Sequence, residues 1–174
     1  MCDDPRVRFA YADPPYLGCC KLYEHYHPDG RCWDDLETHA LLVARLVEDY
    51  PDGWALSLSS PSLREILPLT PTDARVAAWV KPFAAYKRNV RVAYTWEPVI
   101  VRGGRVSSRD GAPPTRDHLS EPITLKRGLT GAKPLRFNRW ILDVLGYVDG
   151  EDDLVDLFPG TAGMADAIAA PRMF

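Results

Sequence analysis

A carboxylate and an aromatic ring follow an apolar segment near the start of the chain. The run Val7 to Ala12 is typical of a buried strand, and Asp13-Pro14-Pro15-Tyr16 comes directly after it. Each proline fixes φ and removes an N–H donor, so the strand has to end there. Ligands bind at the carboxyl ends of strands in open α/β sheets. Asp13 is therefore a candidate proton or hydrogen-bond acceptor beside a ring that can stack on a planar substrate, although a simple Pro-stiffened turn fits equally well.

A glycine turn near the other end of the chain is the second candidate site. Leu154 to Phe158 is expected to be a continuous apolar strand, followed by Pro159-Gly160-Thr161-Ala162-Gly163 and an Ala-rich helix. Glycines let a backbone approach a ligand closely, and a following helix start offers free N–H groups. The sequence up to Phe174 lacks the later strand with an acidic end that a dinucleotide fold needs. It also lacks the Gly-Lys-Ser/Thr of a P-loop.

Strands and helices alternate between these two motifs, which predicts a mainly parallel sheet covered on both faces, in one domain spanning residues 1–174. Asp34 or Asp35 is expected to cap a helix over 34–49, and Gly146 to end a helix that starts at Lys133-Pro134. Further strands are expected at 54–60, 75–80 and 96–102, and a short helix at Pro61, capped by Ser59 or Ser60.

Charge is distributed unevenly along the chain. Residues 81–139 hold 13 Lys and Arg against 4 Asp and Glu, a balance of +9, within a protein of net charge −3. A basic middle between acidic ends suits a surface that meets a polyanion, although a solvated basic face is the alternative. The segments 17–33, 83–95 and 103–132 are expected to be substrate-side loops. The candidate phosphate contacts in the basic middle are Arg88, Arg91, Arg105 and Arg109.

Histidines and cysteines cluster in the first of these loops. The irregular spacing of Cys19, Cys20, His25, His27 and Cys32 matches no zinc pattern, so no metal is expected. Aromatic side chains such as Trp33 in the same loop either contact a ligand or form a cluster that pins the loop. The sequence has no apolar run long enough to span a bilayer and no signal-peptide pattern, which predicts an intracellular protein with reduced thiols.

Asp13-Pro14-Pro15-Tyr16 and Asp156 to Gly163, taken together, resemble the catalytic and cofactor motifs of S-adenosylmethionine-dependent amino-methyltransferases that act on adenine N6 in DNA. The catalytic motif comes first here, as in the permuted β-type enzymes of this family. Lys133-Pro134 resembles the family's Lys-Pro motif, and Trp96 to Val101 its late substrate-side strand. The whole chain is most similar to short DNA methylases of actinobacterial phages and prophages.

The resemblance implies a circularly permuted, three-layer Rossmann-like fold with a reduced sheet, and direct methyl transfer from S-adenosylmethionine to a flipped adenine. It assigns catalysis to Asp13, Pro14, Pro15 and Tyr16, and cofactor binding to Lys133, Asp156, Phe158, Gly160 and Gly163. Gly163 stands one place later than the second glycine of the family pattern, and the family's next strand is missing.

Other functions remain open at this point. The enzyme alternatives are methylation of adenine in RNA or of cytosine N4 in DNA, and family cytosine enzymes more often carry Ser where Asp13 stands. The alternative from another class is a non-catalytic nucleic-acid-binding relative that has lost cofactor binding. DNA is the expected partner, a homodimer or a partner subunit is also compatible, and the expected location is the cytoplasm of a prokaryotic or phage-infected cell.

Overall fold

Six strands form one mixed sheet in the computed structural model, which describes residues 6–22, 30–84, 89–105, 113–124 and 132–171. Their order across the sheet is β5-β3-β4-β2-β1-β6. β4 runs antiparallel to both of its neighbours, and the other pairs are parallel, which confirms the mainly parallel sheet. The strands are β1 (Arg8–Ala12), β2 (Gly53–Ser57), β3 (Arg75–Val80), β4 (Trp96–Gly103), β5 (His118–Ser120) and β6 (Asp153–Asp156).

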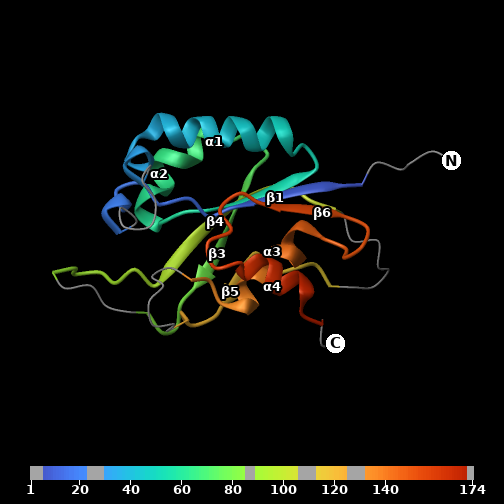
Figure 1. Ribbon diagram of the computed structural model, residues 1–174. Helices are drawn as coiled ribbons and strands as arrows, with labels where there is room; N and C mark the ends of the chain where they lie inside the picture. The colour runs from blue at the N-terminus through green and yellow to red at the C-terminus, as the bar shows by residue number, and fades with distance from the viewer. Residues whose placement is uncertain (1–5, 23–29, 85–88, 106–112, 125–131, 172–174) are drawn as a thin grey trace.

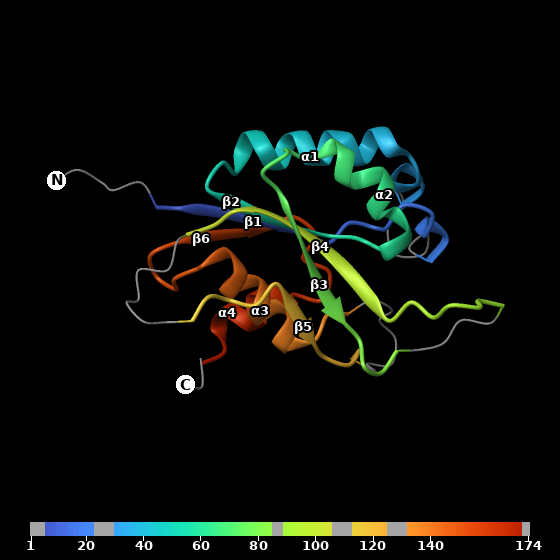
Figure 2. The same cartoon turned by 180° about the vertical axis from the view of Figure 1, so that it is seen from behind.

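Helices cover both faces of this sheet (Figures 1 and 2). α1 (Leu36–Asp49) and α2 (Leu63–Ile66) lie on one face, and α3 (Leu135–Leu145) and α4 (Gly163–Ala169) lie on the other. Successive side chains of a strand point to opposite faces, so each central strand contributes side chains to the core on both faces of the sheet. In β1, for example, Phe9 and Tyr11 join the core beneath α3, whereas Ala10 and Ala12 join the core beneath α1. The architecture is the predicted three-layer α/β arrangement.

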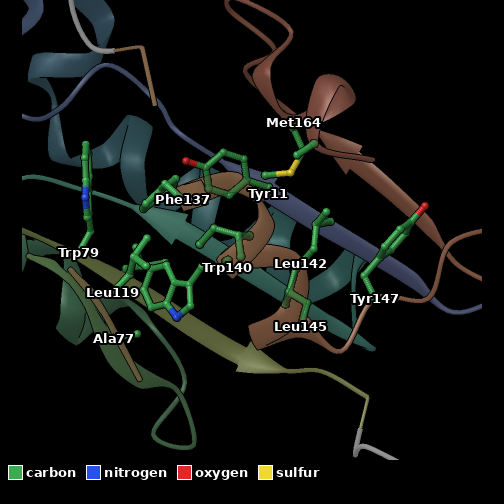
Figure 3. Close-up of a cluster of buried hydrophobic side chains, with 14 of the residues drawn as sticks. Tyr11, Ala77, Trp79, Leu119, Phe137, Trp140, Leu142, Leu145, Tyr147 and Met164 are labelled. Carbon is green, nitrogen blue, oxygen red and sulfur yellow. The ribbon is translucent and has the colours of Figure 1, made fainter. Parts of the chain in front are cut away.

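Aromatic side chains dominate the core between the sheet and α3 (Figure 3). The fully buried ring of Phe137 lies with its centroid 5.0 Å from that of Trp79, 5.7 Å from that of Trp140 and 6.3 Å from that of Tyr11. Tilted and edge-on pairs at these distances add about 0.5–1.5 kcal/mol each beyond the area they bury. This cluster fixes the start of α3 against β1 and β3, and Lys133 lies two residues before α3.

The predicted helix ends agree with the structure in their caps. Asp35 is the N-cap of α1, and its carboxylate accepts the N–H of Glu37 at 3.1 Å. Gly146 ends α3 in the left-handed conformation with φ 68°, and the N–H of Tyr147 reaches the carbonyl of Leu142 at 2.9 Å. Ser59 precedes the short helical turn at Pro61, but its side chain makes no capping bond there.

Three predictions about strands were wrong. The strand expected over 54–60 ends at Ser57, and Ser60 begins the helical turn at Pro61. The loop expected over 103–132 contains β5, which pairs with β3 through Ala78 and His118. Only Leu119 of β5 is buried, so three residues with polar neighbours carry no periodic signal. The last strand ends at Asp156 rather than at Phe158, and it is only half-buried because β6 is an edge strand of the sheet.

Gly146 gives a direct test of the junction between α3 and the end of β4. A Cβ at this position would lie 2.5 Å from the carbonyl oxygen of Arg105, in addition to the strain of its positive φ. Gly150 has a similar φ of +79° but no atom within 4 Å of its Cβ position. We expect Gly146→Ala to lower the free energy of unfolding by at least about 1 kcal/mol more than Gly150→Ala, since overpacking costs about 1–3 kcal/mol. Urea titrations measure the difference, and equal losses would contradict the junction.

Candidate active site

The two motifs that lie at opposite ends of the sequence meet at the carboxyl ends of two neighbouring strands. β1 and β6 are parallel neighbours, with Tyr11 paired to Asp156, and the N–H of Leu157 donates to the carbonyl of Tyr11 at 2.9 Å. The Asp13 loop and the Asp156 to Gly163 loop therefore leave adjacent strands at their carboxyl ends. Parallel pairing across β1 and β6 brings together the two segments that sequence analysis singled out.

A hydrogen-bonded network surrounds the carboxylate of Asp13. The ammonium of Lys133 lies 2.9 Å from each of its oxygens, and the hydroxyl of Tyr16 lies 3.0 Å from Oδ1. Lys133 also donates to the hydroxyl oxygen of Tyr16 at 2.8 Å. Pro14 and Pro15 are buried beneath this network. Lys133 thus contacts the loop after β1, whereas the resemblance had assigned it to the cofactor.

Sequence analysis missed two members of this network. Glu97 accepts a hydrogen bond from the Tyr16 hydroxyl at 2.9 Å, and its Oε2 lies 3.4 Å from the ammonium of Lys133. Its other oxygen accepts from Lys81 at 2.8 Å. Both residues reach the site because β4 begins at the edge where β3 and β1 end. A glutamate between Trp96 and Pro98 in an apolar strand was the available signal.

Burial and neighbouring charges set the pKa values at this site. Burial raises the pKa of Asp13 above its usual range, and this effect outweighs the opposing pull of the Lys133 ammonium. Burial also disfavours ionisation of Glu97, but the ammonium groups of Lys133 and Lys81 outweigh it and lower the pKa of Glu97. Burial, with the charges of Asp13 and Glu97, raises the pKa of Tyr16 well above its usual value. Tyr16 is therefore a neutral phenol at physiological pH.

The ammonium of Lys133 is also enclosed by aromatic rings. It lies 5.2 Å from the ring centroid of Tyr16, 5.8 Å from that of Trp79 and 5.9 Å from that of Phe137. Ring faces attract a desolvated cation, and the Lys133 side chain is only 9% exposed. Carboxylates and rings together compensate for burying this charge, so Lys133 is held in place rather than extended into solvent.

The Asp156 to Gly163 loop is fixed by aromatic packing on its other side. The ring of Phe158 lies 5.1 Å from that of Trp33 in an edge-on contact, and Trp33 in turn packs on His39 at 5.3 Å. Trp33 therefore belongs to an aromatic cluster that pins the loop, which was one of the two alternatives left open by the sequence. The Phe158 N–H donates to the carboxylate of Asp156 at 3.1 Å.

The two glycines of this loop differ in what a side chain at each position would contact. Gly160 has φ +43°, and a Cβ there would meet only the carbonyl oxygen of Phe158, at 3.7 Å. A Cβ on Gly163 would lie 2.7 Å from the side-chain nitrogen of Asn138 on α3. A side chain at position 163 would thus force the Asn138 side chain to shift at the contact between α4 and α3, whereas Gly160 has open surroundings.

The candidate phosphate contacts are dispersed. Arg91 is exposed in the segment between β3 and β4. Arg105 follows β4, at the opposite ends of the strands from Asp13. Its guanidinium pairs there with the buried carboxylate of Asp152. This ion pair gives Arg105 a structural role and argues against the predicted contact with phosphate. Arg88 and Arg109 lie outside the described residues.

In the described part of the cysteine-rich loop, Cys20 packs inside the protein. Cys20 is buried, and burial followed by the neighbouring Asp34 raises the pKa of its thiol to about 12. Within the described ranges, no three His, Cys, Asp or Glu side chains gather in a way that suits a metal ion, and His25 and His27 fall outside those ranges. No helix in the described part of the chain combines the length and apolar character needed to cross a membrane.

The arrangement of this sheet and its two helical layers is a Rossmann-like α/β fold, and solved structures of other proteins share it. Among solved structures, M1.HpyAVI in complex with SAM superposes with a TM-score of 0.57 at 19% identity, over 94% of this chain and 77% of that chain. TTHA0409, a putative DNA modification methylase from Thermus thermophilus complexed with S-adenosyl-L-methionine, superposes with a TM-score of 0.55 at 14% identity, over 95% and 77%. No protein-family model matches the sequence, and no curated protein does. These likenesses establish the fold.

Replacing Lys133 tests its role as the cation shared by Asp13 and Glu97. In Lys133→Met the folded-state pKa of both carboxyls rises, so the folded protein loses stability as the pH increases through those pKa values. We expect a loss of about 1–3 kcal/mol at pH 7.5, which diminishes towards pH 4.5 as carboxyls take up protons. Urea titrations at the two pH values measure it. Lys21→Met, at an exposed site, is the control, and a loss independent of pH would contradict the shared-cation role.

Proposed function

We propose that this protein is an S-adenosylmethionine-dependent DNA methyltransferase that methylates the exocyclic N6 amine of adenine. The observation that carries the proposal is the meeting of Asp13 and the Asp156 to Gly163 loop at the carboxyl ends of two adjacent parallel strands. The likeness in fold to TTHA0409 and M1.HpyAVI, both solved with the same cofactor, supports it.

The carboxylate of Asp13 retains capacity for a substrate amine. A carboxylate offers about four lone-pair positions. Tyr16 and Lys133 approach Oδ1, and Lys133 approaches Oδ2, so three positions are in use. The remaining position on Oδ2 suits one N–H of an amine. The Pro14 carbonyl, which follows in the chain, is the proposed acceptor for the second N–H.

The residues around Asp156 fit a cationic cofactor. Burial raises the pKa of Asp156, and the nearby charge of Asp13 raises it further, so two carboxylates act on each other at the ends of β1 and β6. A positively charged ligand placed there would relieve this repulsion. Gly160 leaves the adjacent backbone approachable. When bound, S-adenosylmethionine would supply a methyl group attached to a positively charged sulfur.

The chain's own residues would prepare the amine for transfer. Accepting its N–H bonds at Asp13 and at the Pro14 carbonyl draws the nitrogen towards sp³ geometry and releases its lone pair from the ring. The cofactor, held beside the Asp156 to Gly163 loop, would supply the methyl group to this nitrogen and keep the electron pair of its carbon–sulfur bond as a neutral thioether, and the proton that the amine loses would leave along its hydrogen bond to the Asp13 carboxylate. Positioning and electrostatics supply the rate enhancement, because no covalent enzyme intermediate is needed. Tyr16, held by its hydroxyl, would present its ring to a flipped base.

Contact with DNA is proposed for the described residues between the end of β3 and the first residue of β4. Phe83, Tyr94 and Trp96 are 54%, 41% and 37% exposed there, and Arg91 is exposed among them. No Asp or Glu stands between Lys81 and Trp96. Lys81 itself is buried against Glu97, and Lys87 and Arg88 lie outside the described residues, so Arg91 is the exposed cation that the structure describes there. Exposed rings with cations and without acids suit unstacked bases and phosphates. Both ends of this segment lie beside the Asp13 network, through Lys81 and Glu97.

The experiment that tests the function is methylation of duplex DNA with a tritiated methyl donor, followed by nucleoside analysis of the product. We expect N6-methyladenine. Asp13→Asn, which keeps the shape of the side chain, should lower kcat by at least about 100-fold, because a charged acceptor at the reacting amine is lost. Affinity for the cofactor, measured by calorimetry, should change by less than about twofold.

Asp49→Asn is the matched control, because Asp49 is exposed on α1 and pairs with Arg45. N4-methylcytosine as the product would overturn the adenine assignment, and methylation of RNA alone would overturn the DNA assignment. A protein that binds nucleic acid but neither binds the cofactor nor transfers methyl groups would be the non-catalytic relative. Full activity in Asp13→Asn would remove Asp13 from the mechanism.

The salt dependence of DNA binding tests Arg91. Each phosphate neutralised contributes about 0.9 to the slope of log affinity against log salt on duplex DNA. We expect Arg91→Ala to flatten that slope by about one unit. Fluorescence anisotropy with a short duplex at several salt concentrations measures it. Arg45→Ala on α1 should leave the slope unchanged, and an identical slope in both variants would exclude Arg91 as a phosphate contact.

A further inference from the structure

Both oxygens of the Glu97 carboxylate are engaged at the edge of the site. Oε1 accepts from Lys81 at 2.8 Å, and Oε2 accepts from the Tyr16 hydroxyl at 2.9 Å while lying 3.4 Å from the ammonium of Lys133. Glu97 therefore contacts two of the groups that surround Asp13 without contacting Asp13 itself. We infer that Glu97 is a positioning residue, which keeps Tyr16 and Lys133 in place and leaves Asp13 able to accept a hydrogen bond from the substrate amine.

The Tyr16 hydroxyl is the point at which Glu97 acts. A phenol carries one proton, and that of Tyr16 has two acceptors within reach, Asp13 Oδ1 at 3.0 Å and Glu97 Oε2 at 2.9 Å. When Tyr16 donates to Glu97, Oδ1 of Asp13 is left with Lys133 as its donor and gains capacity for an amine N–H. When Tyr16 donates to Asp13, that capacity is used. A second anionic acceptor beside Tyr16 thus frees a position on Oδ1, in addition to the one that remains on Oδ2.

Lys81 makes the position of Glu97 rigid. Glu97 is paired with Trp79 across β3 and β4, and the Lys81 side chain, 9% exposed, lies with its ammonium 5.5 Å from the ring centroid of Trp79. The backbone N–H of Lys81 donates to the carbonyl of Thr95 at 2.7 Å, which continues the strand pairing beyond β3. An ion pair that only joined these strands would not need the contact with Tyr16. The second oxygen of Glu97 therefore links the β3–β4 pair to the catalytic loop.

The test is the kinetics of Glu97→Gln, which removes the charge but keeps the shape. The kinetic test rests on the proposed function. We expect kcat to fall by about 10- to 100-fold, as for other residues that orient a catalytic group, with KM for DNA and the cofactor dissociation constant within about twofold. Glu121→Gln is the matched control, because Glu121 is 21% exposed against 19% for Glu97 and pairs with Arg136 instead of the site. It should stay within about twofold of wild type.

The pH profile separates positioning from a structural role. The groups that act on Asp13 are Tyr16, Glu97, Lys133 and, at the end of the neighbouring strand β6, Asp156. The buried Tyr11 lies in β1, two residues before Asp13, and Lys81 acts through Glu97. Glu97 raises the pKa of Asp13, so its neutralisation should lower that pKa. We expect the acid limb of kcat/KM to move to lower pH in Glu97→Gln, and not in Glu121→Gln. A kcat within twofold of wild type, or an acid limb that does not move, would overturn the inference.

Two further measurements cover the remaining outcomes. If Glu97→Gln fails to fold because Lys81 is left unpaired, Lys81→Met/Glu97→Gln removes both charges, and the same loss of kcat is expected in it. If the wild-type protein transfers no methyl group, the proposed function fails, and the inference is decided by the carboxyl carbon titration of Asp13 in NMR spectra. A lower pKa of Asp13 in Glu97→Gln than in wild type supports the inference, and an equal or higher value overturns it.

Discussion

The ammonium of Lys133 joins the segments that form the candidate site. Lys133 precedes α3, and it reaches the carboxylate that follows β1 and the carboxylate within β4. Removing such a charge from water is costly, and it is compensated here by two anions and three ring faces. Segments far apart in the sequence are consequently fixed relative to one another.

The reversed direction of β4 is the second constraint. In a fully parallel sheet, the beginning of a strand lies at the edge away from the ligand site. Because β4 is antiparallel, its first residues lie beside the last residues of β1, β2 and β3. Glu97 can therefore meet Tyr16, and Lys81 at the end of β3 can meet Glu97. The reversed β4 therefore adds the carboxylate of Glu97 to the side of the sheet where the parallel strands β1 and β6 place Asp13 and Asp156.

Much of the fold was predictable because its signals are local. The two prolines after Asp13, the cap at Asp35 and the glycine that ends α3 each follow from the chemistry of one or two residues. The direction of β4 was not predictable from hydrophobic pattern, since apolar alternation is the same in both directions. β5 gave no signal because one buried leucine makes no pattern. The contacts of Glu97, Lys81 and Lys133 depend on the order of strands, which no short motif encodes.

The carboxylates of Asp13 and Asp156, at the ends of β1 and β6, differ in how far nearby cations offset their charge. Asp13 is neutralised by Lys133, so its remaining acceptor position suits a neutral amine better than a free cation. Asp156 has the N–H of Phe158 as its described hydrogen-bond donor, and its charge is not offset by a described ion pair. A cation placed at the edge therefore gains more beside Asp156 than beside Asp13. Under the proposed function, this asymmetry assigns the amine to the β1 and β4 side and the positively charged methyl donor to the β6 side. The polarity of methyl transfer would then be fixed before either ligand binds.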